Sequence, residues 1–257
     1  MAQYDRQTLA TGRVGTAAAI DEGLRSHMLR VYNYMGIGLA LTGLIAFFAS
    51  QMAVTGDASA AAAQLADGTY LTQWGVLLYT TPLMWVVALS PLAFVLVLSF
   101  GINKLSFGAA QATFWGFAAV MGLSLSSIFL VYTGASIAKV FFITAAMFGS
   151  MSLYGYTTKR DLTAMGGFLM MGLIGLIIAM VVNIFLASSA LDFAISAIGV
   201  VIFVGLTAYD TQKIKEAYAE NIGHEGLGKL AIMGALTLYL DFINLFLMLL
   251  RLFGNRE

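Results

Sequence analysis

The sequence predicts an all-α membrane protein with seven transmembrane helices. Hydrophobic residues make up 60% of the chain and charged residues 10%, against about 25% charged residues in a typical soluble domain. A water-soluble domain of this size needs more polar surface to cover its core. The composition therefore argues against a soluble enzyme, a disordered chain and a nucleic-acid-binding protein.

Seven stretches reach the roughly 20 mostly apolar residues that a membrane-spanning helix needs. They are Met28–Met52, Pro82–Phe100, Phe107–Tyr132, Ser136–Thr158, Met165–Ala187, Leu191–Tyr209 and Leu230–Phe253. Residues 1–27 are polar and lack the apolar run of a secretory signal. We therefore expect a retained tail (1–27) followed by a seven-helix transmembrane domain (28–253).

The distribution of basic residues predicts the orientation. Ten of the 13 lie on the side of the N-terminus: Arg6, Arg13, Arg25, Arg30, Lys104, Lys159, Arg160, Lys213, Lys215 and Lys229. The other side holds three, Lys139, Arg251 and Arg256. Because positive loops stay cytoplasmic, the N-terminus is expected in the cytoplasm and the C-terminus outside.

The first loop, Ala53–Thr81, is the only long one. We expect a short surface helix there, with Asp57 as N-cap, an alanine-rich body and Gly68 as its end. Pro82 suits the start of the second span. Pro91 lies inside that span and should kink it and free a carbonyl, a feature that favours packing over gating.

Motifs of common enzyme classes are absent from the sequence. There is no phosphate-binding loop, zinc-protease motif or serine-hydrolase elbow, and no cysteine. Ser136 and Lys139 match a four-residue SxxK pattern that arises readily by chance, and His27 and His224 are placed in cytoplasmic loops, where they would make a poor metal site. The last span has no lysine for a retinal Schiff base. We therefore expect no enzyme and no cofactor.

Acidic residues in the last two spans carry the strongest functional signal, because an intramembrane charge costs about 2.5–3.5 kcal/mol or more. Asp241 lies in the middle of the last span and shares a helix face with Asn244. That face must point into the bundle, which makes this helix a candidate for its centre. Asp210 lies near the inner end of the sixth span, one turn after Thr207. Asp192, at the outer edge, is expected to be a solvated first-turn carboxylate.

Each of the two inner carboxylates also has a purely structural interpretation. Asp210 could be an interfacial carboxylate paired with Lys213, and Asp241 a protonated packing residue. Helical spacing also places them at different depths: Asp241 is about 18 Å from Lys229, whereas Asp210 is within a turn of Lys213. To pair, the sixth span must continue past Tyr209, the seventh must start outside the membrane, or a helix must tilt.

The C-terminal part of the chain contains the segments Gly205-Leu-Thr-Ala-Tyr-Asp210-Thr-Gln-Lys-Ile-Lys215, Leu238-Tyr-Leu-Asp241-Phe-Ile-Asn-Leu-Phe246 and Leu249-Leu-Arg-Leu-Phe-Gly254. The residues of these segments and their spacing resemble the transmembrane Bax inhibitor motif (Bax inhibitor-1-like) family, in particular a bacterial inner-membrane member. The resemblance covers essentially all seven spans.

The resemblance implies six helices around a central seventh and a pH-sensitive calcium leak governed by a carboxylate pair, here Asp210 and Asp241. Two carboxylates close together in a low-dielectric bundle cannot both ionise at low cost, so the pair would respond to pH. Some members also have a basic residue that latches the first carboxylate, and Lys104 stands in that place. Where such a member has arginine, lysine loses bidentate pairing.

Two functions follow as hypotheses. The first is a proton-gated leak for calcium, a hard cation that takes oxygen ligands and would be the permeant ion rather than a cofactor. The second is a non-transporting regulator that binds a membrane-anchored quality-control protease or another membrane protein, with the polar tail as a handle. Both place the chain in the lipid bilayer, and neither involves nucleic acid.

Overall fold

A computed structural model describes residues 2–65, 68–219 and 222–255, with side chains from residue 22 onward. Its helices are α1 (Ala2–Ala53), α2 (Gln73–Tyr79), α3 (Leu83–Gly101), α4 (Phe107–Leu125), α5 (Gly134–Thr157), α6 (Thr163–Leu186), α7 (Ser189–Glu216) and α8 (His224–Phe253). Two 3-10 turns, η1 (Ala58–Ala60) and η2 (Ser126–Leu130), complete the helical part. Seven of these helices are long and apolar enough to cross a membrane, so the predicted fold class and its seven spans are confirmed.

Helix α1 differs from the expected tail and span. It is one continuous helix from Ala2 to Ala53, so the expected polar tail and the first span belong to the same helix. At the other end of the chain, α7 continues to Glu216 and α8 begins at His224, so both helices exceed the predicted spans on the side of their connection.

The extension of α7 is explained by the connection between α5 and α6, which satisfies its polar side chains. The Gln212 amide accepts a hydrogen bond from Leu162 N (2.8 Å) and donates one to the Arg160 carbonyl (2.8 Å). Lys215 Nζ donates to the Tyr156 carbonyl (2.8 Å). Because these side chains have partners within the protein, the helix does not need to stop where its apolar run stops.

The first loop corrects the expected surface helix. Asp57 is the predicted N-cap, accepting from Ser59 N (2.8 Å), but the helix is only the 3-10 turn η1. Instead, strands β1 (Val54–Thr55) and β2 (Ala63–Gln64) pair antiparallel with β3 (Tyr70–Leu71), which lies between them. Gly68, with φ +93°, belongs to the turn that precedes β3. So short an alanine run is too weak a helix former to outcompete pairing with β3.

The hydrogen bonds to Asp57 also affect its charge. Both the backbone N–H and the hydroxyl of Ser59 donate to the carboxylate, and they hold the pKa of Asp57 below its usual range. The carboxylate is thus kept ionised in this exposed loop, where it caps η1.

The two prolines lie at the predicted places in the second span, and the kink at Pro91 stays a prediction. Pro82 is the N-cap of α3, and Pro91 lies inside this helix. The carbonyl that Pro91 leaves without its usual partner, that of Val87, accepts a hydrogen bond from the Ser90 hydroxyl (2.9 Å). The helix therefore remains a single element despite its internal proline.

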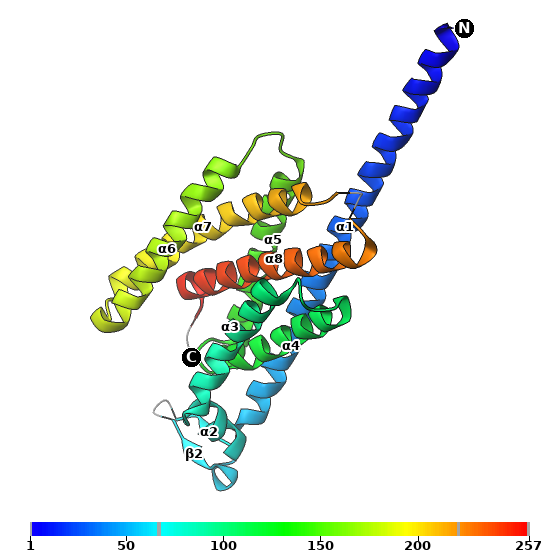
Figure 1. Cartoon of the computed structure of the whole chain (residues 1–257). Coiled ribbons are helices and arrows are strands. Elements are labelled where there is room, and N and C mark those ends of the chain that lie inside the picture. The colour runs from blue at the N-terminus through cyan, green and yellow to red at the C-terminus, as the bar shows by residue number, and fades with distance from the viewer. Residues whose placement is uncertain (1, 66–67, 220–221, 256–257) are drawn as a thin grey trace.

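Helix α8 is the most buried of the seven spans. It packs against α1, α3, α4, α5 and α7, while α6 packs mainly against α7. Figure 1 shows α8 crossing the molecule between α6 and α7 on one side and α1, α3 and α4 on the other. The complete six-helix ring around the seventh helix stays a prediction.

Buried polar contacts fix α8 in this position. Tyr239 is fully buried, and its hydroxyl lies 2.6 Å from Thr42 Oγ1, which donates to the Ala118 carbonyl (2.8 Å). These bonds join α8, α1 and α4.

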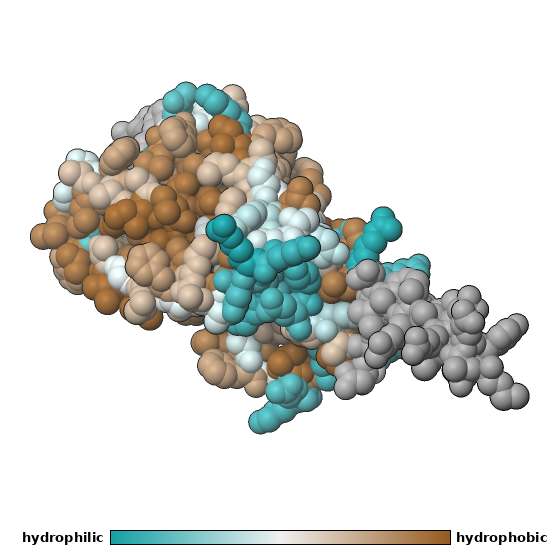
Figure 2. All heavy atoms as spheres, turned by 90° about the horizontal axis from the view of Figure 1, so that it is seen from above, coloured by the Kyte–Doolittle hydropathy of each residue, from teal (hydrophilic) through white to brown (hydrophobic). Residues whose placement is uncertain are grey.

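The outer helices present apolar side chains outward. Phe100 at the end of α3 is 82% exposed and Phe185 near the end of α6 is 83% exposed. Figure 2 views the molecule from above Figure 1. Hydrophilic residues gather near the centre of that face, and large areas around them are hydrophobic. Such a surface fits a lipid bilayer and would be unfavourable in water.

Candidate carboxylate site

The two carboxyl groups singled out in the sequence lie together between α7 and α8. Asp241 is buried in α8, and Asp210 is half-buried in α7. Their side chains are close enough for a hydrogen bond between them and for electrostatic interaction. Because α7 continues about two turns past Tyr209, the structure meets the first of the three conditions for pairing.

This contact has a chemical requirement. An ionised carboxylate only accepts hydrogen bonds, so two carboxyl groups can hydrogen-bond to each other only when one carries a proton. The Oδ2 atom of Asp241 is buried without a hydrogen-bond partner. A proton on one of the two carboxyl groups would let them hydrogen-bond to each other.

Two of the predicted supporting residues, Thr207 and Asn244, use their polar side-chain groups within their own helices. Thr207 Oγ1 donates to the Phe203 carbonyl (2.7 Å), and Asn244 Nδ2 donates to the Leu240 carbonyl (2.8 Å). Both groups are thus occupied by the backbone of their own helix.

The two lysines proposed beside the pair differ in position. Lys213 interacts electrostatically with Asp210, and its Nζ lies 5.9 Å from the ring centroid of Tyr209. Lys104 is exposed in the connection between α3 and α4 and is not among the groups that interact with Asp210. The latch suggested by the resemblance is therefore not formed in this conformation.

A chain of hydroxyl groups next to the pair was not predicted. Tyr32 Oη lies 2.7 Å from Ser152 Oγ, which lies 2.9 Å from Thr211 Oγ1. Thr211 Oγ1 in turn donates to the Thr207 carbonyl (2.7 Å). These residues come from α1, α5 and α7, and the four-residue spacing of the two threonines was the only signal of the chain in the sequence.

The placement of both histidines in loops is wrong, because His224 is the first residue of α8 and His27 lies within α1. His27 is buried, its Nε2 has no hydrogen-bond partner, and its ring centroid lies 5.5 Å from that of Tyr218. Tyr218, in the connection between α7 and α8, packs its hydroxyl onto Gly23 one turn earlier in α1. His27 is thus covered by this connection. No group of three or more metal-ligating side chains occurs in the part of the chain that the structure describes.

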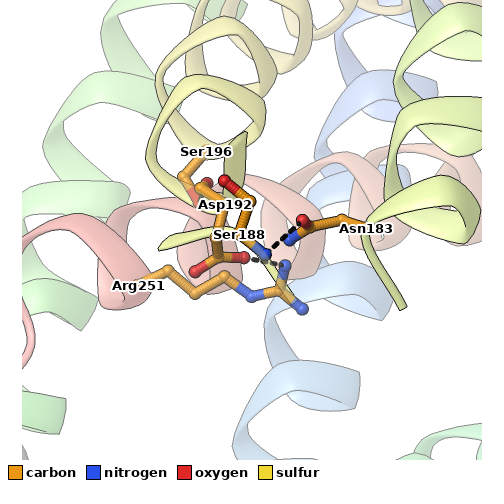
Figure 3. Close-up of polar contacts among 5 residues, drawn as sticks. All are labelled: Asn183, Ser188, Asp192, Ser196 and Arg251. Carbon is orange, nitrogen blue, oxygen red and sulfur yellow. Dashed lines mark hydrogen bonds and ion pairs between the residues drawn. The ribbon is translucent and has the colours of Figure 1, made fainter. Parts of the chain in front are cut away.

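The opposite ends of α7 and α8 meet in an ion pair. Asp192 lies in the first turn of α7 and is partly exposed, as predicted, and it also pairs with Arg251. Arg251 Nη1 lies 3.6 Å from Asp192 Oδ1, and both side chains are about 40% exposed. Figure 3 shows the guanidinium reaching from α8 to the first turn of α7, where Asn183 Oδ1 accepts from Ser188 N (3.0 Å). The pair joins the two helices at the end away from Lys213.

Ser136, the serine of the SxxK pattern, forms a hydrogen bond near the C-terminal end of α8. Ser136 is buried, and its Oγ accepts a hydrogen bond from Asn255 N (2.9 Å). The hydroxyl is therefore used to hold the residues that follow α8.

Comparison with known proteins adds to this geometry. The family model described as "Inhibitor of apoptosis-promoting Bax1" matches residues 24–257. The chain is 49% identical over 243 residues to the inner membrane protein YbhL of Escherichia coli K12, covering 91% of this chain and 94% of YbhL. It is 46% identical over 258 residues to a protein of Rickettsia prowazekii, covering both chains fully, and 39% identical over 234 residues to a Deinococcus radiodurans protein, covering 91% and 92%.

Proposed function

The chain belongs to the Bax inhibitor-1-like family of membrane proteins, and from this membership we propose that it is a calcium leak protein gated by the protonation of Asp210 and Asp241. We place it in the bacterial inner membrane, as the name of YbhL suggests, with its N-terminus in the cytoplasm. It acts without enzymatic chemistry and without a resident cofactor.

The contact between Asp210 and Asp241 is the observation that carries this proposal. The two residues belong to the motifs through which the chain resembles the family, and they join the two helices that would have to separate. Calcium binds oxygen ligands, and tight sites use six to eight of them. Two carboxylates are too few for tight binding, and this suits passage of the ion better than storage.

Protons can control such a site through the contact itself. Losing the shared proton would place two negative charges side by side in a low-dielectric environment, which is unfavourable. The pair would then separate or attract a cation. The family resemblance supplies the direction, with acid promoting the leak.

The test is calcium flux into liposomes that contain only this protein, measured with an internal dye across a pH series. We expect Asp210→Asn and Asp241→Asn each to change the pH profile, and the double variant to add much less than the sum of the two, because both disrupt one interaction. Asp161→Asn, in an exposed loop carboxylate, is the matched control and should keep the wild-type profile.

Two outcomes would contradict the proposal in different ways. Wild-type pH profiles in both single variants would show that the pair is not the switch. Flux no greater than that of empty liposomes would exclude the leak and favour the non-transporting regulator, for which a membrane-anchored protease is the candidate partner.

A further inference from the structure

A groove lies on the surface between α1 and α5, on the side of the bundle where α1 enters. It measures about 560 Å³ and is lined by Met28, Leu29, Phe148, Gly149 and Leu153, with Arg25 at one end. Because α1 and α5 are both candidate membrane spans, the groove faces the space that lipid occupies.

The packing of the two helices explains why the groove stays open. Both pack against α8 but not closely against each other, and the bond between Tyr32 and Ser152 bridges them at the floor. Gly149 contributes no side chain, and a Cβ atom built there would meet nothing within 4 Å. The protein thus leaves room at this point for something other than its own side chains.

The only charged residue that lines the groove is a cation. Arg25 lines it, and no acidic residue does. Neither of the two ion pairs in the described part of the chain involves Arg25. Lys215 adds a second cation nearby, because its Nζ bonds to the carbonyl of Tyr156, another lining residue.

We propose that this groove binds an anionic phospholipid of the leaflet on the N-terminal side, with one acyl chain against Met28, Phe148 and Leu153 and the phosphate at Arg25. From Arg25 to Tyr32 the groove follows α1 for about 10 Å, within the roughly 15 Å of hydrocarbon in one leaflet. A long apolar wall with a single cation at its interfacial end matches an acyl chain and a negative head group. The proposal does not depend on calcium transport.

Photo-crosslinking in proteoliposomes tests it directly. Two probes carry the same photoactivatable acyl chain, one on phosphatidylglycerol and one on phosphatidylcholine, and labelled peptides are located by mass spectrometry. We expect labelling of the α1 and α5 peptides that line the groove, about fivefold stronger with phosphatidylglycerol, the preference that one arginine near a head group supplies.

Four variants separate the head group from the acyl chain. Arg25→Gln should bring the labelling ratio of the two probes close to one, whereas Arg30→Gln, on the same helix but outside the groove, should leave it unchanged. Gly149→Leu should fill the groove and suppress labelling by both probes. Gly175→Leu, at an exposed position of α6 with equally open space, should not.

The results that overturn the proposal are distinct. Equal labelling by both probes in the wild-type protein, or a ratio unaffected by Arg25→Gln, would remove head-group recognition. Groove labelling that persists in Gly149→Leu would show that the acyl chain lies elsewhere. Absence of groove labelling while peptides of α6 are labelled would mean that the groove holds no lipid.

Discussion

Single glycines determine how closely the helices approach. At Gly155 of α5, a Cβ atom would collide with the backbone carbonyl of Ala208 in α7, and at Gly166 of α6 it would collide with the ring of Tyr209. Helix association in membranes depends on such close packing, since lipid supplies little hydrophobic force between helices. Gly155 and Gly166 therefore act as contact points between helices. Gly149 does not, because no neighbouring helix lies within contact distance of it.

We predict that Gly155→Ala lowers the free energy of unfolding by about 1–3 kcal/mol, the usual effect of overpacking. Gly149→Ala, on the same helix but in open space, is the control and should be neutral or stabilising, because alanine favours a helix by about 1 kcal/mol over glycine. Thermal unfolding of both variants in one detergent measures the difference. Equal midpoints for the two variants would contradict the close contact between α5 and α7.

At the same scale, the sequence could predict part of the site. The free-energy cost of burying a charge was enough to predict that Asp241 faces the interior of the helix bundle. Its partner came from the family resemblance, because spacing alone put Asp210 at another depth. The hydroxyl chain from Tyr32 to Thr211 and the burial of His27 could not be predicted, since each depends on residues far apart in sequence.

At the scale of elements, apolar runs predicted the seven membrane-spanning helices. The predicted helix boundaries and loop structure are wrong where polar groups form hydrogen bonds with distant parts of the chain. The α7 helix outlasts its apolar run because Gln212 is bonded by another loop. The alanine-rich loop forms strands because β3 offers a pairing edge. Neither partner is visible in local sequence. In α3, by contrast, Ser90 next to Pro91 supplies a local hydrogen bond that compensates for the proline.

This compensation predicts a dependence between two substitutions. Ser90→Ala should destabilise the protein by about 1 kcal/mol, because the Val87 carbonyl then lacks a donor in an apolar environment. In a Pro91→Ala background, the restored backbone N–H takes over that carbonyl, and Ser90→Ala should cost much less. The measurement is a double-mutant cycle of thermal stability; additive effects of the two substitutions would show that Ser90 does not compensate for Pro91.

At the scale of the whole molecule, the basic-residue bias predicts that the loop with Ser59 is extracytoplasmic and the α7–α8 connection cytoplasmic. The chain has no cysteine, so single cysteines at Ser59 and Gly223 report each side. Gly223 tolerates the change, because its φ is −61° and its Cβ would meet nothing within 4 Å. An impermeant thiol reagent on intact cells should label position 59 only; labelling of 223 with 59 spared would reverse the topology.

The glycine contacts of α5 and α6 have a consequence for how the molecule can move. At Gly155 the backbone of α5 packs against the backbone of α7, and at Gly166 the ring of Tyr209 packs against α6. Sliding of α5, α6 and α7 along one another would therefore cause steric clashes. We expect them to move as one unit, and α1, α3 and α4, of which α4 packs against both others, to move as a second. Any opening would then be a rocking of these two units about α8. The hydroxyl bridge from Tyr32 to Ser152 spans the line along which they would part.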